Sequence, residues 1–292
     1  LTNELMPRWG RKRMEEISRA DVIALLEAIT ERGGPIMANR ILVEVRVFFD
    51  WYARTTGTLT ANPAADVEAT GVEITRDRTL SNDELKLVWT AADKLEWPVA
   101  PYVKLLILTA QRRGEIIGMR WADLDLDGAE PLWTLPRELT KANRLHTVPL
   151  SPQAVNIIRG LPRVEGPFVF STGKGKDNKP RPINNFSGDK RALDREIAKT
   201  AEDAGTDIPA PWTLHDLRRS AATGMAGLNV APHVLSRILN HSLGKSEGTT
   251  SVYNRFEYLE KKRHALNTWA AHVERIIAGK PSGNVVALQH TA

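Results

Sequence analysis

The sequence predicts a mainly α-helical protein with one small antiparallel β-sheet, in which a helical N-terminal domain precedes a mixed α+β domain. Three observations support this fold class. Capping signals precede apolar residues with helical spacing, two short strand-like runs flank a polar turn, and a polar stretch without apolar periodicity separates the two parts.

The N-terminal domain, residues 1–74, is predicted to be a small helical unit. Residues 1–17 have no regular pattern and are expected to be irregular and basic. Ser18 and Asp21 have the spacing of a capping box, and apolar residues with helical spacing follow them. Pro35 favours the first turn of the next helix, whose apolar stripe runs through residues 36–54.

The second domain is predicted to cover residues 75–277. It follows the polar stretch 71–79, which we interpret as an interdomain linker, and its first helix begins at a capping box formed by Ser81 and Glu84. Residues 278–292 are rich in residues typical of turns and are predicted to be a flexible tail. Further helical patterns occupy residues 99–118 (two segments), 184–204, 213–226, 231–240 and 256–277.

Strand-like patterns are confined to the middle of the second domain. Residues 132–135 and 145–148 flank a polar turn and predict a hairpin, and residues 168–170 predict one more short strand. The Gly- and Lys-rich segment 171–182 is predicted to be a flexible basic loop. Two interpretations of that loop remain open, because it could be solvated or could lie along a phosphate backbone.

Composition limits the function without identifying it. The 292-residue chain carries a net charge of +5, which is compatible with nucleic-acid binding and also with an ordinary solvated surface. Absence of cysteine excludes disulfides, cysteine-bound zinc and a thiol nucleophile, and it is consistent with a cytoplasmic location. No apolar run of about 18 residues predicts a membrane span. The first residue is Leu1, so the numbering is expected to begin inside a longer protein.

Two pairs of residues with a spacing of three are candidates for binding an anion. Arg112 and Glu115 share a helix face if the segment is helical, so the carboxylate could hold the guanidinium towards phosphate oxygens. A simple surface ion pair is the alternative. His215 and Arg218 also share a face, in the first turns of a predicted helix, where anions are favoured.

Three further candidates could take part in proton transfer or nucleophilic attack. Lys141 lies in the predicted hairpin turn, where a lysine is usually only solvated but could protonate a leaving oxygen. His241 follows a predicted helix end, where the dipole would favour a cationic imidazole. Tyr253 follows a polar segment and could be a nucleophile, although composition alone does not separate it from Tyr258.

These residues lie in four strings that resemble the tyrosine recombinase, or phage integrase, family in content, order and spacing. The resemblance covers residues 1–277 and is greatest for integrases of satellite prophages and genomic islands. It implies a core-binding, DNA-binding domain followed by a catalytic domain. Integrases of this kind also carry an additional arm-binding domain before the core-binding domain. The strings are TAQRRGEIIGMRWADLD (109–125), TKANRLHTVPLS (140–151), HDLRRSAATG (215–224) and LNHSLGKSEGTTSVYNR (239–255).

The resemblance also implies roles for the candidates in DNA strand breakage and rejoining. Tyr253 matches the nucleophile that joins a 3′ phosphate, and Lys141 matches the lysine that protonates the leaving 5′ oxygen. The remaining matches are the two catalytic arginines, the histidine of His-x-x-Arg and the second histidine, which are Arg112, Arg218, His215 and His241. Two positions depart from the family pattern, because Ala110 and Asn240 stand where glycine is usual.

The implied partners are double-stranded DNA attachment sites, three further copies of the chain in a homotetramer on DNA, and accessory DNA-bending or directionality proteins. No cofactor, metal or membrane is expected. Two rival functions remain open. Residues 220–241 also suit a helix-turn-helix of a DNA-binding protein without catalysis, and a type IB topoisomerase would use the same residues to relax DNA.

Overall fold

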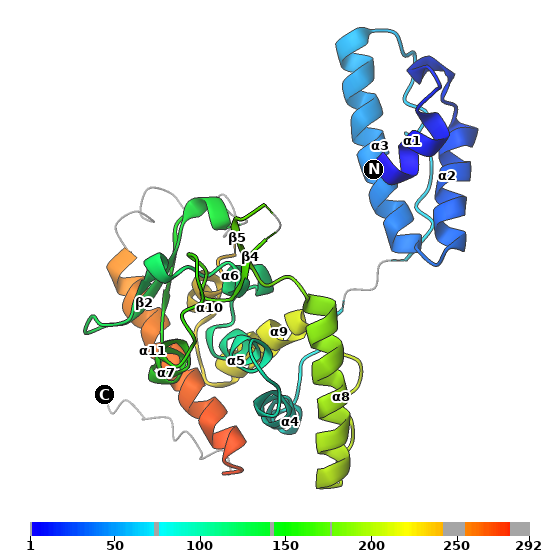
Figure 1. The fold of residues 1–292 in the computed structure, drawn as a ribbon. Helices are drawn as coiled ribbons and strands as arrows, with labels where there is room; N and C mark the ends of the chain where they lie inside the picture. The colour runs from blue at the N-terminus through cyan, green and yellow to red at the C-terminus, as the bar shows by residue number, and fades with distance from the viewer. Residues whose placement is uncertain (1, 73–75, 141–142, 176, 242–254, 281–292) are drawn as a thin grey trace, which may run out of the picture. The chain divides into compact units, whose positions relative to one another are not determined.

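The computed structural model describes residues 2–72, 76–140, 143–175, 177–241 and 255–280 (Figure 1). It divides into two compact units, Leu1–Arg76 and Asp77–Ala292, each with its own hydrophobic core. Within the described ranges, no helix combines the length and the apolar character that crossing a bilayer requires.

The first unit is helical, with α1 (Thr2–Trp9), a 3₁₀ turn (Met14–Glu16), α2 (Arg19–Glu31) and α3 (Pro35–Thr56). The expected capping box is present, since Ser18 and Asp21 exchange their hydrogen bonds at the start of α2. The expectation of an irregular segment over residues 1–17 is wrong for α1 and the 3₁₀ turn. Trp9 is buried and lies 6.4 Å from Phe49 between ring centroids, so contact with α3 stabilises a helix that has only a weak local signal.

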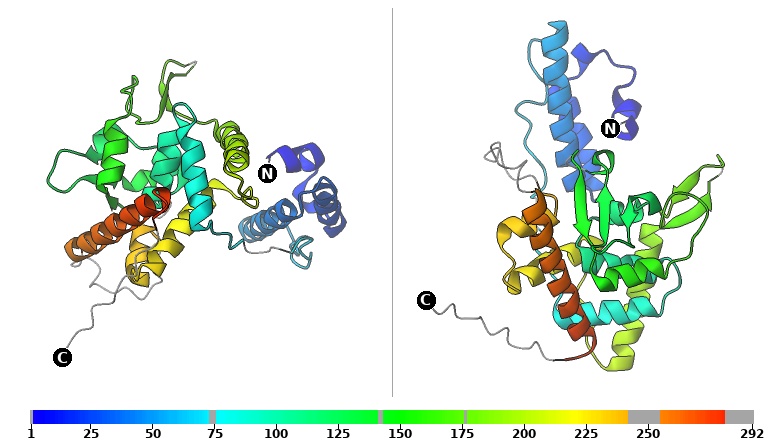
Figure 2. Two further views of the ribbon diagram at one scale, coloured as in Figure 1. Left: turned by 90° about the horizontal axis from the view of Figure 1, so that it is seen from below. Right: turned by 90° about the vertical axis from the view of Figure 1, so that its left-hand side faces the viewer.

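The second unit is mainly helical, and α5 (Val99–Thr109) lies at its centre. This helix packs against α4 (Asn82–Asp93), α7 (Pro152–Arg159), α9 (Leu214–Gly227) and α11 (Arg255–Ile277), an arrangement visible from two sides in Figure 2. Most of its side chains are therefore buried. Among the described residues, the remaining helices are α6 (Arg113–Ile117), α8 (Phe186–Ala204), α10 (Pro232–Ile238) and two 3₁₀ turns, Trp121–Asp123 and Arg137–Leu139.

A three-stranded antiparallel sheet of order β1-β2-β3 carries the central hairpin of this unit. β1 (Leu124–Asp125) pairs with β2 (Leu132–Leu135), and β2 pairs with β3 (His146–Pro149), with Trp133 opposite Val148. The predicted hairpin is therefore confirmed. α11 packs against β3, which brings the last described helix of the chain beside the hairpin.

The segment 168–182 differs from its prediction. Within 168–170, Phe168 makes only an isolated bridge to Arg120, so the predicted strand is wrong. The predicted basic loop instead forms a second antiparallel pair, β4 (Ser171–Lys174) and β5 (Pro180–Pro182). Asn178, at φ +59°, supplies the left-handed backbone that the turn between these strands needs. Of the residues that suggested a loop, Gly173, Lys174 and Arg181 lie in the strands, whereas Gly175 and Lys179 lie in the turn.

Candidate functional site

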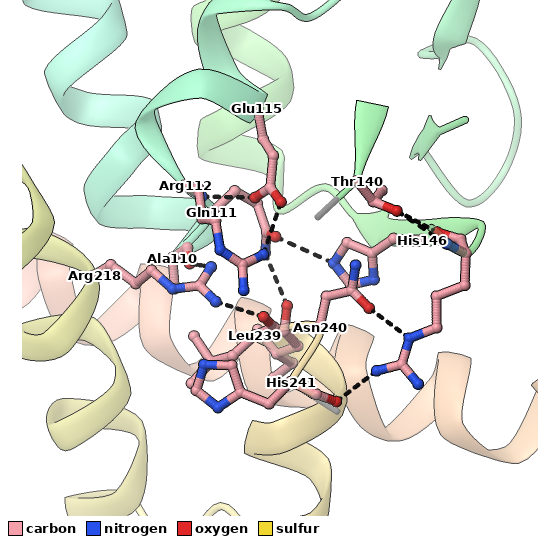
Figure 3. Close-up of polar contacts among 12 residues, drawn as sticks. Ala110, Gln111, Arg112, Glu115, Thr140, His146, Arg218, Leu239, Asn240 and His241 are labelled. Carbon is pink, nitrogen blue, oxygen red and sulfur yellow. Dashed lines mark hydrogen bonds and ion pairs between the residues drawn. The ribbon is translucent and has the colours of Figure 1, made fainter. Parts of the chain in front are cut away.

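Arg112 is held at the start of α6 by a carboxylate on the same short helix. Its backbone N donates to Glu115 Oε2 at 2.7 Å, and its Nη1 donates to Glu115 Oε1 at 2.9 Å (Figure 3). Glu115 is buried, whereas Arg112 is partly exposed. Arg112 is the N-cap residue rather than a member of a longer helix, but the carboxylate orients its guanidinium as the sequence pattern predicts. Arg113 is exposed beside it.

The backbone before Arg112 takes a conformation in which glycine is common. Ala110 caps α5 with φ +54°, in the left-handed region, and is fully buried. Its carbonyl oxygen accepts a hydrogen bond from Arg218 Nη1 at 2.7 Å. Alanine therefore adopts the left-handed cap conformation here, and the interaction with Arg218 offsets part of the cost.

Arg218 joins three segments from a buried position in α9. It is only 4% exposed, and its Nη1 and Nη2 donate to the carbonyl oxygens of Ala110 and Leu239. Burial, together with the nearby charge of Arg112, lowers the pKa of Arg218 to about 10. The guanidinium remains protonated at neutral pH.

Two imidazoles lie near these arginines. His215 occupies the first turn of α9, whose Thr213–Asp216 capping box fixes the start of the helix. Desolvation and the charges of Arg219 and Arg218 lower the pKa of His215. Loss of water also lowers the pKa of His241, with Arg218 and Arg112 adding to the effect. The helix dipole favours a cationic His241, whereas burial and the nearby arginines act in the opposite direction and lower its pKa.

The turn that carries His241 has a left-handed residue of its own. α10 ends at Ile238, and Asn240 follows with φ +47°. The His241 backbone N then donates to Ser236 O at 3.0 Å, which closes the end of the helix. Asparagine thus supplies the left-handed conformation for which glycine is common.

A buried network that the sequence did not predict lies behind these groups. Gln111, fully buried, donates from Nε2 to Ile238 O at 3.0 Å, and its Oε1 lies 3.1 Å from His146 Nε2 (Figure 3). Burial, with a contribution from Lys262, lowers the pKa of His146 to about 2, so this imidazole is neutral. A histidine in a short apolar strand was the one local signal for it.

The structure thus brings Arg112, His215, Arg218 and His241 into one electrostatically coupled cluster. Two predicted site residues, Lys141 and Tyr253, lie outside the described residues. Tyr258 lies in α11 with its ring 4.5 Å from the Arg237 guanidinium carbon. The cluster offers cations for the oxygens of a tetrahedral anion and two imidazoles for hydrogen bonding or proton transfer.

The remaining tyrosines lie elsewhere. Tyr102 is buried in α5, and the half-buried Tyr52 donates its hydroxyl hydrogen to Glu15 in the first unit. No group of three or more histidine, aspartate or glutamate side chains in the described ranges has a geometry suited to holding a metal ion.

Comparisons with known proteins agree along both units. Residues 78–260 match the model of the Phage integrase family, and residues 1–70 match that of the Phage integrase central domain. Prophage integrase IntZ of Escherichia coli strain K12 is 29% identical over 286 residues, covering 96% of this chain and 65% of the relative. The integrase of Shigella phage Sf6 is 23% identical, over 92% of this chain and 66% of its own length.

The chain therefore spans about 65% of the length of these relatives. Solved structures share its fold. A lambda integrase dimer bound to a COC′ core site has a TM-score of 0.59 and 19% identity, covering 84% of this chain and 86% of that one. A Tn1549 transposon integrase in complex with a circular intermediate DNA has a TM-score of 0.61 and 16% identity, covering 87% and 91%.

Proposed function

The chain belongs to the phage integrase family, and from this we propose that it is a tyrosine site-specific recombinase that cuts and rejoins DNA during integration and excision of a mobile element. The observation that carries the proposal is the cluster of two arginines and two histidines, in which Glu115 orients Arg112 and backbone carbonyls hold Arg218. This arrangement suits a phosphodiester on which negative charge builds up.

In the proposed reaction Tyr253 Oη attacks the phosphorus atom and a covalent 3′-phosphotyrosine forms. The bond from phosphorus to the 5′ oxygen breaks, and Lys141 donates the proton that this oxygen needs. Arg112 and Arg218 bind the non-bridging oxygens. His215 accepts the tyrosine proton, a role that its lowered pKa supports because such a shift favours the neutral imidazole, and His241 donates a hydrogen bond to the phosphate. The 5′ hydroxyl of another strand then reverses the step.

The proposed partners are double-stranded DNA attachment sites and three further copies of the chain. Support comes from relatives of the same fold, since one lambda integrase structure is a dimer on a core site and another is a tetramer on a Holliday junction. We further assign the chain to the integrases of satellite prophages and genomic islands, on the strings Asn39-Arg40, QRRGE and Tyr253-Asn254-Arg255. Accessory DNA-bending or directionality proteins would complete the assembly.

A nicked suicide substrate tests the proposal. Cleavage near the nick releases a short oligonucleotide with a free 5′ hydroxyl, and once it diffuses away the reaction cannot be reversed and the covalent intermediate accumulates. The unaltered chain, with its own attachment sequence and a chelator present, is expected to form a protein–DNA adduct through the 3′ phosphate. Tyr253→Phe removes only the nucleophilic oxygen, so it should bind DNA and form no adduct. Tyr258→Phe is the matched control and should still form one.

Each rival has its own outcome in this assay. An adduct that persists in Tyr253→Phe moves the nucleophile to another residue. Absence of an adduct from the unaltered chain, with specific DNA binding intact, indicates a DNA-binding protein without catalysis. Adduct formation accompanied by relaxation of supercoiled DNA lacking any attachment site indicates a type IB topoisomerase-like activity.

A further inference from the structure

Arg144 connects two parts of the site through hydrogen bonds. Its backbone contacts Thr140, and its side chain contacts Asn240 and His241. Arg144 lies in the connection between β2 and β3, a few residues after Lys141 in the sequence. Thr140, immediately before Lys141, is buried, and its Oγ1 accepts from Arg144 N at 3.1 Å and lies 2.8 Å from Arg144 O. One threonine hydroxyl therefore holds both backbone polar groups of Arg144.

The side chain of Arg144 binds the turn that follows α10. Its Nε donates to Asn240 Oδ1 at 2.9 Å, and its Nη2 donates to the carbonyl oxygen of His241 at 2.5 Å. A guanidinium suits this task because its planar fork can donate to two acceptors at once. Both acceptors belong to the left-handed turn that carries the His241 imidazole.

The side-chain amide of Asn240 provides a hydrogen-bond acceptor for Arg144, which its backbone conformation does not require. Glycine would adopt φ +47° more readily but has no acceptor for Arg144. Asn240 is 4% exposed, and its Nδ2 has no hydrogen-bond acceptor among the described residues. An unpaired buried donor is costly, so the amide is not explained by stability alone.

We propose that Arg144 and Asn240 act together as positioning residues for strand cleavage. Their contact holds Thr140 and Arg144 against the His241 turn and thereby sets His241 relative to Arg112 and Arg218. The inference rests on the proposed function for its catalytic consequence.

The test compares Arg144→Gln, Asn240→Gly and the double variant with the unaltered chain. Asn240→Gly keeps the favoured backbone conformation and removes the acceptor, so folding is expected to survive even if Arg144→Gln impairs it. Arg159→Gln is the matched control, because Arg159 also bridges a carbonyl oxygen and a side chain, Leu126 O at 2.8 Å and Asp127 Oδ1 at 2.9 Å, away from the site.

Single-turnover cleavage at saturating DNA is the first readout. Each single variant is expected to be slower by about tenfold or more, since small displacements of a catalytic group have effects of this size. The double variant should be no slower than the slower single variant, because both substitutions break one link. Dissociation constants for DNA should change by less than about twofold, and Arg159→Gln should match the unaltered chain.

The second readout is the pKa of the His241 imidazole, measured by NMR in the absence of DNA. Both single variants should raise it, because the ring moves away from the arginines, whereas a general loss of stability would leave the folded-state value unchanged. Additive effects in the double variant overturn the proposal. So does weaker DNA binding with a shallower salt dependence and a normal cleavage rate, which would make Arg144 a phosphate contact.

The two proposals fail separately. If the unaltered chain forms no adduct on its attachment DNA, the proposed function is wrong, while the NMR measurement still reads the link between Arg144 and His241. If the unaltered chain cleaves and Asn240→Gly neither slows it nor moves the pKa of His241, only the positioning role is wrong.

Discussion

Arg218 has a structural role as well as a chemical one. Its guanidinium satisfies the carbonyl oxygens of Ala110 and Leu239 at the ends of two helices. Removing the side chain would leave these acceptors without that donor, at a cost of about 1–3 kcal/mol for each buried group. Arg112 differs, because it is partly exposed and its side-chain hydrogen bond is made within its own short helix.

This difference leads to distinct predictions for the two arginines. Arg112→Ala should reduce cleavage by at least about 100-fold, as expected for loss of a transition-state donor, with little change in melting temperature. Arg218→Ala should lose as much activity and should also lower the melting temperature. Suicide-substrate cleavage and thermal unfolding measure the two effects.

The adjacent arginines are the controls for this pair. Arg113 is exposed, with its guanidinium carbon 4.4 Å from the Phe186 ring centroid, and Arg219 pairs with Asp216 at 2.7 Å. Arg113→Ala and Arg219→Ala should both have milder effects on cleavage. Equal losses for Arg112→Ala and Arg113→Ala would contradict the assignment of Arg112.

His146 predicts acid sensitivity of the second unit. Its folded-state pKa of about 2 lies below the ordinary value of 6.5, so at acidic pH the unfolded chain binds the proton more readily. The contribution of His146 to the free energy of unfolding is constant above about pH 6.5. Below that pH it falls by about 1.4 kcal/mol for each pH unit, until the pH approaches the folded-state pKa. Urea unfolding between pH 7 and pH 5 measures this slope.

His146→Gln isolates that contribution, because glutamine does not titrate and its amide can still donate to Gln111 Oε1. Below pH 6.5, unfolding of the variant should take up about one proton fewer. The slope of unfolding free energy against pH should therefore become shallower by about 1.4 kcal/mol per pH unit. An unchanged slope in His146→Gln would show that other groups cause the acid sensitivity.

At the scale of elements, local signals predicted the helices well. Ser18–Asp21 and Ser81–Glu84 form the capping boxes that their spacing indicates, because a cap depends on only four consecutive residues. The Arg112–Glu115 contact could be predicted for the same reason, because the two residues are only three positions apart. By contrast, α1 needs Trp9 to contact α3, and the partner of Arg144 is 96 residues away.

The electrostatic character of the site was also beyond local prediction. The helix end before His241 suggested a cation, but the lowered pKa arises from burial and from arginines on α9 and before α6. The Gln111–His146 pair likewise joins residues from different elements. Such features depend on how the second unit folds and not on the spacing within any one string.

The crossing of α9 and α11 gives a prediction about a pair of elements. A Cβ atom at Gly224 would lie 2.2 Å from Trp269 Cζ3, and Trp269 is held in place because its Nε1 donates to Ile107 O at 2.8 Å. Gly224→Ala should therefore destabilise the second unit by about 1–3 kcal/mol through overpacking, measured by chemical unfolding.

Gly227→Ala is the control on the same helix. A Cβ there would meet nothing within 4 Å, so this variant should be neutral or slightly stabilising, since alanine has the higher helix propensity. If both substitutions leave stability unchanged, close packing of α9 on Trp269 is not required.

At the scale of the whole molecule, charge is distributed unequally between the two units. Residues 1–76 contain 10 Lys and Arg against 11 Asp and Glu, which leaves the excess of positive charge in residues 77–292. Cations of the N-terminal basic run are partly paired as well, with Lys12 Nζ 2.6 Å from Asp21 and Arg13 Nε 3.8 Å from Glu15. The second unit is thus expected to make most contacts with phosphate.

This distribution refines what removing the first unit should do. If both units bind the same DNA, residues 77–292 alone should bind an attachment site measurably more weakly than the whole chain. The slope of log K against log salt should nevertheless fall by less than half, because each lost phosphate contact contributes about 0.9 to that slope and few are expected from a unit without excess positive charge. Titrations of labelled DNA at several salt concentrations give both quantities. Equal affinity for the fragment and the whole chain would mean that the first unit does not contact DNA, whereas loss of most of the salt dependence would place the phosphate contacts in that unit despite its charge.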